Sequence, residues 1–169
     1  MRNLMKFSAV LLFMVVTASI NAQTLKFGHI DMNALIQVMP ERATAETEFN
    51  KFQNDLEDVL TDLQKDLQTK MNEFDSLDAT VSDVKRNAKV TEITDLQQRI
   101  QNYQQSANQQ LQQKQTELMK PIYDKALKAV GDVAKEQGMI YVFDSNSLLY
   151  KSNQSVDILP MVKQKLGIQ

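Results

Sequence analysis

Residues 41–81 contain neither glycine nor proline, and this feature limits the folds open to the chain more than any other. The apolar residues there recur at alternating spacings of three and four, in two series: Phe49, Leu56, Leu63 and Leu77, and Leu60, Leu67 and Phe74. This spacing aligns them along one seam of an α-helix, as in a coiled coil. The residues between them are mostly charged or amide side chains, so the pattern predicts one long helix with a solvated outer face.

A second apolar seam follows, formed by Ile93, Leu96, Ile100, Tyr103, Ala107, Leu111, Leu118 and Ile122. Ser, Thr and Asp residues, which favour helix caps, separate the two seams over residues 75–83. We therefore expect an antiparallel helical hairpin over residues 41–136, with its tip near residues 78–88. The composition of the glutamine-rich stretch 97–115 would suit disorder, but the seam continues through it and favours a helix. Pro121 lacks an amide donor, so a bend of the arm or a restart of the helix is expected there.

Short apolar segments near the two ends of the chain predict β-strands. They are residues 24–31, Met139–Asp144 and 148–150, the last two joined by a turn at 145–147. A short amphipathic helix is expected at 156–166. Because an antiparallel hairpin returns the chain to its start, these segments can form one body from residues 23–40 and 137–169. The fold class is thus mainly α with a small β part: a long coiled-coil hairpin on a small β-rich body.

The expected body has only about 50 residues, which is marginal for an independent hydrophobic core. Its strands would also leave unpaired edges, which association with other copies would cover. The apolar side chains expected to form this body and its contacts with other copies are Phe27, Ile30, Ile140, Val142, Leu148 and Leu149.

Residues 1–22 have the features of a secretory signal peptide. Arg2 and Lys6 precede an apolar run at 7–16, and Ala22 offers a small residue for cleavage. A membrane anchor is the alternative, but the run is short for a bilayer span. We therefore expect export and no stable membrane anchor. Cleavage would reduce the basic side chains from 19 to 17 against 21 acidic ones, so an overall basic field that would gather nucleic acid is absent.

The residues that usually carry chemistry are sparse. His29 is the only histidine, which excludes a multi-histidine metal site and suggests a structural or pH-responsive strand residue. Asp31 and Asp144 are candidates for a carboxylate pair, although both also suit caps of the following elements. The sequence contains no glycine-rich phosphate loop. We predict no catalytic residues, no metal site and no cofactor, and a protein that holds other macromolecules.

Several segments resemble the Skp (OmpH-like) chaperones of the Gram-negative periplasm. They are residues 27–32 with Leu35, 118–125, 133–138, and 142–144 followed by 148–150; the order of elements also matches. The resemblance implies a homotrimer with a β-barrel-like body and three arms around a cavity, which captures unfolded outer-membrane proteins without ATP. The best-known members are strongly basic, whereas this chain has a pI of about 5.4. The resemblance therefore assigns no lipopolysaccharide-binding residue to this chain.

Two functions fit these patterns. The first is a periplasmic holdase chaperone that keeps unfolded outer-membrane proteins from aggregating. The alternative is a structural or adaptor coiled-coil protein of the cell envelope, which would share the hairpin but need no cavity. Leu77, Val81 and Val84 lie where the seam weakens, so they are the candidate client contacts, although closure of the tip would explain them equally well.

Overall fold

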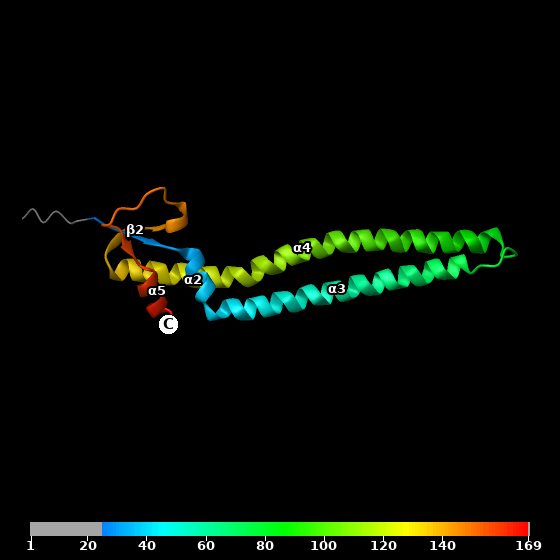
Figure 1. Cartoon of the computed structure of the whole chain (residues 1–169), viewed down its shortest axis with the longest axis horizontal. Coiled ribbons are helices and arrows are strands. Elements are labelled where there is room, and N and C mark those ends of the chain that lie inside the picture. Colours follow the sequence, from blue (N-terminus) through cyan, green and yellow to red (C-terminus); the bar gives the residue numbers. More distant parts are fainter. Residues whose placement is uncertain (1–24, 169) are drawn as a thin grey trace, which may run out of the picture.

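The computed structural model describes residues 25–168, and the expected signal peptide at 1–22 lies outside the described residues. The elements are β1 (Lys26–Ile30), α2 (Met32–Val38), α3 (Pro40–Asp75), α4 (Asp83–Glu136), β2 (Met139–Asp144), the 3-10 turn η2 (Ser145–Ser147), β3 (Val156–Asp157) and α5 (Leu159–Lys165). Figure 1 shows a small body from which α3 and α4 project side by side as one long arm. The predicted helical hairpin on a small β-containing body is therefore confirmed.

The arm is held together by the predicted seam. Leu63 of α3 and Leu96 and Ile100 of α4 are buried against one another, with Leu60, Leu67 and Tyr103 packed around them. The Tyr103 hydroxyl donates a hydrogen bond to the carbonyl of Leu56 at 3.1 Å, which links the two helices directly. With 36 residues, α3 extends for about 54 Å at the usual helical rise.

The tip of the arm lies earlier in the chain than expected. Because α3 ends at Asp75 and α4 begins at Asp83, the connection spans residues 76–82 rather than 78–88. The Asp78 carboxylate accepts a hydrogen bond from the Thr80 amide at 2.8 Å, and this turn reverses the chain within a few residues. Residues 83–88 contain no helix-breaking residue, so they join α4.

Pro121 lies inside α4, which continues through it without a restart. Proline cannot donate to the carbonyl four residues earlier, and such a gap is a common cause of helix bending. Figure 1 shows α4 changing direction between the body and the arm. The next residue, Ile122, is buried in the body core, so the proline lies in the segment where the body gives way to the arm.

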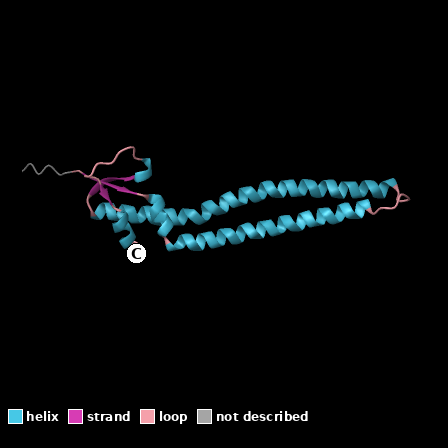
Figure 2. Ribbon diagram, viewed as in Figure 1, coloured by secondary structure: helices cyan, strands magenta, loops and turns pink. Residues whose placement is uncertain are grey.

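The three strands form one sheet in the order β2-β1-β3, with both neighbours parallel to β1 (Figure 2). The predicted returning strand at 148–150 is wrong. Asp144 accepts hydrogen bonds from Asn146 and thereby caps η2, which turns the chain away from β2. The chain then reaches the other side of β1, where the Ile158 amide donates to the His29 carbonyl at 3.0 Å. Because residues 156–157 pair with β1, the last helix is also shorter than expected.

The body core lies between one face of the sheet and the helices α2, α4 and α5. Its buried residues include Ile30, Leu35, Ala126, Val133, Ile158 and Val162. Gly28 allows the sheet to approach this core closely, since a Cβ there would lie 2.6 Å from Met139 Sδ and 3.3 Å from Val142 Cγ2.

Candidate functional site

The six residues expected to form the trimerisation body separate into two groups. Ile30 is buried in the core of its own body, and Val142 packs against that same core. The alternation of side chains along a strand places these two on the inner face of the sheet, where they pack toward the core of their own body. Phe27, Ile140 and Leu149 are exposed, and Leu148 is half-buried, so these four remain candidates for contacts between copies.

Three aromatic side chains form a strip on the outer face of the sheet. The rings of Phe27 and Tyr141 stack with their centroids 6.4 Å apart, and Phe143 lies 5.9 Å beyond Tyr141. Phe27 lies opposite Tyr141 in the register of β1 and β2. Of this aromatic strip, only Phe27 is among the contact residues predicted from the sequence, although alternation along β2 places Tyr141 and Phe143 on one face.

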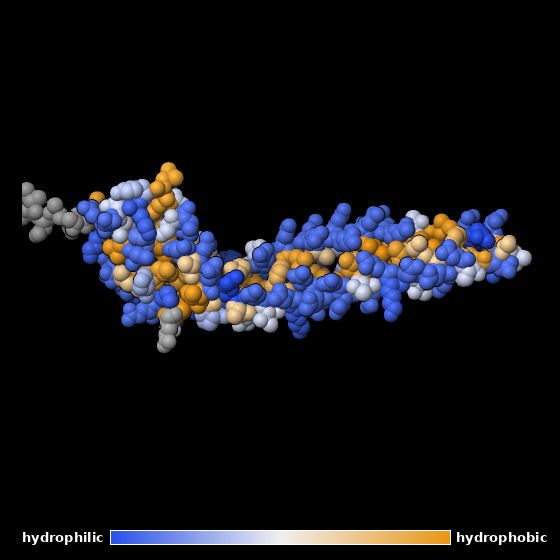
Figure 3. Space-filling view, viewed as in Figure 1, coloured by the Kyte–Doolittle hydropathy of each residue, from blue (hydrophilic) through white to orange (hydrophobic). Residues whose placement is uncertain are grey.

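The edges of the sheet adjoin this aromatic strip and are unpaired within the described chain. β2 has a neighbour on one side only, and β3 covers just two residues of β1 on the other. Leu149 and Tyr150 in the following loop are also strongly exposed. Figure 3 shows hydrophobic surface gathered on the body and along the seam of the arm. Open edges beside apolar side chains suit association with another polypeptide.

The three candidate client contacts at the tip differ in exposure. Val84, in the first turn of α4, is 79% exposed, whereas Leu77 and Val81 are half-buried. Arg86 lies over the ring of Phe74, 5.8 Å from its centroid, and covers the end of the seam. Leu77 and Val81 thus partly close the tip, and Val84 is the residue most available for contact with another molecule.

A cluster of opposite charges joins the two helices just below the tip. Lys89 on α4 lies 2.7 Å from Glu73 on α3, and Lys70 on α3 lies 3.5 Å from Glu92 on α4. The hydrogen bond from Lys89 lowers the pKa of Glu73, and the same bond raises the pKa of Lys89. The two glutamates are exposed and the two lysines are half-buried, so the cluster lies at the surface and fixes helix register more than it adds stability.

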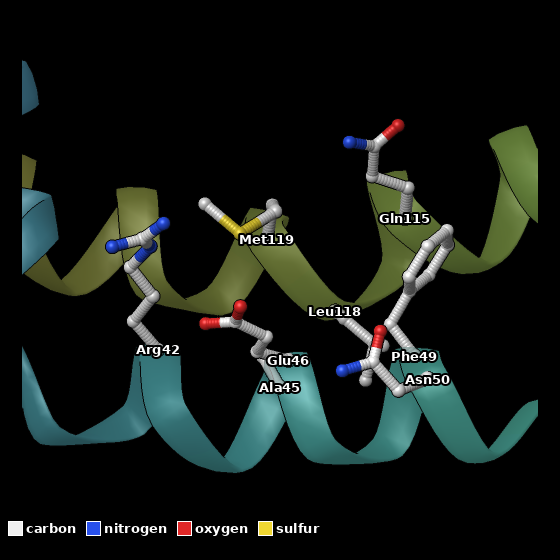
Figure 4. Close-up of a pocket in the computed structure, with 8 residues that line it drawn as sticks. All are labelled: Arg42, Ala45, Glu46, Phe49, Asn50, Gln115, Leu118 and Met119. Carbon is white, nitrogen blue, oxygen red and sulfur yellow. The ribbon is translucent and has the colours of Figure 1, made fainter.

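An open groove lies between the helices at the base of the arm (Figure 4). It has a volume of about 240 Å³ and is lined by Arg42, Ala45, Glu46, Phe49, Asn50, Gln115, Leu118 and Met119. Figure 4 shows Phe49 rising from α3 toward α4, with Leu118 and Met119 on the facing helix. The lining mixes apolar and polar side chains, and no sequence pattern predicts it.

The two carboxylates at the ends of β1 and β2 cap local structure. Asp31 accepts a hydrogen bond from the Ala34 amide at 2.9 Å and another from the Asn146 side chain, and these bonds lower its pKa. Asp144 binds the same asparagine. Over residues 25–168, no group of three or more His, Asp or Glu side chains is placed to hold a metal ion. Across those same residues, no helix combines the length and apolar character needed to cross a bilayer.

The fold and these surfaces define a class of protein: a coiled-coil hairpin on a small parallel-sheet body, with exposed apolar residues suited to contacts with other macromolecules. The model of the OmpH-like outer membrane protein family matches residues 26–166. The chain therefore belongs to the OmpH-like family.

Individual relatives agree with this assignment. The chaperone protein Skp of Yersinia enterocolitica is 26% identical over 156 residues, which cover 89% of this chain and 93% of the relative. An uncharacterized protein of Aquifex aeolicus is 29% identical over 143 residues, covering 85% and 86% of the two chains. A crystal structure of an OmpH-like protein from Caulobacter crescentus superposes with a TM-score of 0.73 at 11% identity, covering 84% of this chain and 83% of that one. The last likeness concerns the fold alone.

Proposed function

We propose that this protein is an ATP-independent holdase chaperone of the periplasm, which binds unfolded outer-membrane β-barrel proteins and prevents their aggregation. Membership of the OmpH-like family and the similarity to a chaperone named Skp support this role. The observation that carries it is the arm itself, a long helical hairpin held by its own seam that ends in the exposed Val84. Such an arm presents surface to a client without an enclosed active site.

The proposal includes assembly of three copies through the body, with the arms enclosing a cavity. Its support is the combination of the aromatic strip, the exposed Ile140 and Leu149, and the edges of β2 and β3, which have no partner within residues 25–168. Pairing of such edges between copies would satisfy their backbone groups and bury the apolar side chains beside them.

Client binding would rest on many weak contacts. No hydrolysis step drives release in this proposal, so each contact must break readily, and the strength comes from effective concentration within the cavity. Because acidic side chains outnumber basic ones, we expect these contacts to be more apolar than ionic. Val84 at the tip, with Leu77 and Val81 beside it, is the starting candidate.

An aggregation assay tests the proposal. An unfolded β-barrel protein is diluted from denaturant with the chain at near-stoichiometric ratio, and light scattering is recorded. A holdase suppresses scattering, whereas the alternative, a structural or adaptor protein of the envelope, leaves it unchanged.

The contact residues are tested by changing Leu77, Val81 and Val84 together to Ser. The matched control changes Ala79 and Thr80 of the same turn to Ser, which removes no large apolar side chain. We expect weaker holding in the triple variant and normal holding in the control. Affinity should also stay nearly constant as salt is raised; a steep loss would indicate ionic capture, which salt screens, and would contradict the apolar account.

Assembly is tested by sedimentation of the wild type and of an Ile140→Asp variant. Ile140 is a better site than Val142, because a charge at Val142 would disrupt the core of the body itself. The control is Val59→Asp, midway along α3 of the arm, at a similarly exposed valine. We expect a trimer for the wild type and the control and a smaller species for Ile140→Asp. A monomeric wild type would refute the assembly.

A further inference from the structure

His29 lies on the outer face of the sheet and is buried there, whereas the neighbouring side chains on the same face are exposed. The ring is 5% exposed, whereas Phe27 and Phe143 on the same face are 39% and 43% exposed. Phe143 is the register partner of His29, so the position within the sheet does not explain the difference. The cover comes from the loop at residues 148–155, which binds both nitrogens of the ring.

The two contacts of the ring fix its protonation. Lys151 Nζ lies 3.1 Å from Nε2, and Ser155 Oγ lies 2.9 Å from Nδ1. A lysine ammonium group only donates hydrogen bonds, so Nε2 must present its lone pair. The ring proton is then on Nδ1 and is donated to the Ser155 hydroxyl. The geometry thus requires neutral His29 in its Nδ1–H form.

We propose that His29 is a proton-sensitive latch for the 148–155 loop and for β3, the edge strand that follows it. A second proton on the ring would occupy Nε2, remove the acceptor of Lys151 and place two cations side by side. Lys151 would then leave the ring and the loop would lose one of its two anchors. Acidification that protonates the ring therefore releases the loop.

The other groups that face the ring do not restore the anchor. On β3, Asp157 is the register partner of His29 and would attract a protonated ring. Its carboxylate already accepts a hydrogen bond from the Leu159 amide at 3.0 Å. On β2, the same face presents the aromatic rings of Tyr141 and Phe143. Attraction by Asp157 favours the protonated ring and leaves Lys151 unbound, so it assists release of the loop.

Release of the loop would change a part of the body that carries exposed apolar side chains. The loop carries the exposed Leu149 and Tyr150, and β3 covers one edge of β1. A looser loop changes both the placement of these side chains and the protection of that edge. This inference concerns loop order alone, so it stands or falls independently of the proposed chaperone function.

Nuclear magnetic resonance of the full chain gives a direct test. Because His29 is the only histidine, its ring nitrogens need no assignment. We expect the Nδ1–H form at about pH 8. The amides of Ser155 and Ile158, which donate to the carbonyls of Ser152 and His29, report on the loop and on β3. If opening of the loop takes up one proton, its equilibrium constant changes by up to about tenfold per pH unit. The protection of these two amides should therefore fall as the pH is lowered.

Two variants keep the test decisive. His29→Asn retains a donor for Ser155 but cannot titrate, and Lys151→Met removes the group that protonation displaces. In both, the protection of Ser155 and Ile158, corrected for intrinsic exchange, should lose its dependence on pH between about 8 and about 5. An Nε2–H ring at the higher pH, an unchanged wild-type protection, or a pH response that persists in Lys151→Met would each overturn the latch. If His29→Asn fails to fold, Lys151→Met decides alone.

Discussion

Leu63 offers the sharpest test of how the arm is stabilised. It belongs to the buried cluster of the arm together with Leu96 and Ile100, and its side chain is 8% exposed. This arm cluster is separate from the body core, which includes Ala45 and Ile122 at the base of the hairpin. Leu63→Ala should therefore weaken the arm while the body keeps its structure.

The size of the effect follows from the atoms removed. The substitution deletes three carbons, and at about 0.8 kcal/mol for each buried group the transfer cost is about 2.4 kcal/mol. Among the described residues, α4 alone packs there, so it can move partly into the space, which keeps the cavity contribution small. We expect a loss of about 2–3 kcal/mol, near the lower end of the usual range for Leu→Ala.

The measurement is chemical denaturation followed by helical circular dichroism, with amide exchange to locate the loss. The matched control is Val59→Ala, one turn earlier on α3, where the side chain is 45% exposed. We expect the control to stay within about 0.5 kcal/mol of the wild type, as is usual for exposed positions. An equal effect of the two substitutions, or exchange that rises in the body rather than the arm, would refute the idea that the seam stabilises the arm.

Three further predictions concern the tip, the bend and the sheet. The pKa of Glu73 is lowered, so its contribution to the stability of the tip is present above the ordinary value of 4.5 and is lost as pH falls through the lowered value. The pKa of Lys89 is raised, so its contribution to the same stability is present below 10.5 and is lost as pH rises through the raised value. The protection of amides near the tip, corrected for intrinsic exchange, should therefore fall in acid and in strong base, and Glu73→Gln should remove the acid response. Pro121→Ala should stabilise α4 by up to about 3 kcal/mol, because alanine restores a helical hydrogen bond, and should alter the bend seen by X-ray scattering; unchanged scattering would place the origin of the bend elsewhere. Gly28→Ala should cost about 1–3 kcal/mol in denaturation experiments, since its Cβ would press on Met139 and Val142, and a neutral result would show that Met139 moves aside freely.

Much of the site depended on placement that no local pattern records. The strand segments 26–30 and 139–144 were predictable from their apolar content, yet that content does not tell which face each side chain occupies. The sequence therefore does not distinguish Ile30 and Val142 from Phe27 and Ile140, whereas the structure places the first two against the core and the other two at the surface. Tyr141 and Phe143 belong to the aromatic strip because the register of β1 and β2 places them beside Phe27.

The seam of the arm was determined by the sequence alone, because the helical period turns the order of apolar residues directly into a face. Burial of that apolar face against the second helix then brings Leu63 into contact with Leu96 and Ile100. The sheet was decided only by the tertiary structure. Residues 148–150 are as apolar as a strand, but the parallel partner of β1 is the less apolar pair Val156–Asp157. The segment that pairs with β1 is selected by the position of the chain after η2. Contacts with distant parts of the molecule set that position. His29 shows the same dependence, since its neighbours Lys151 and Ser155 lie more than 120 residues away in sequence.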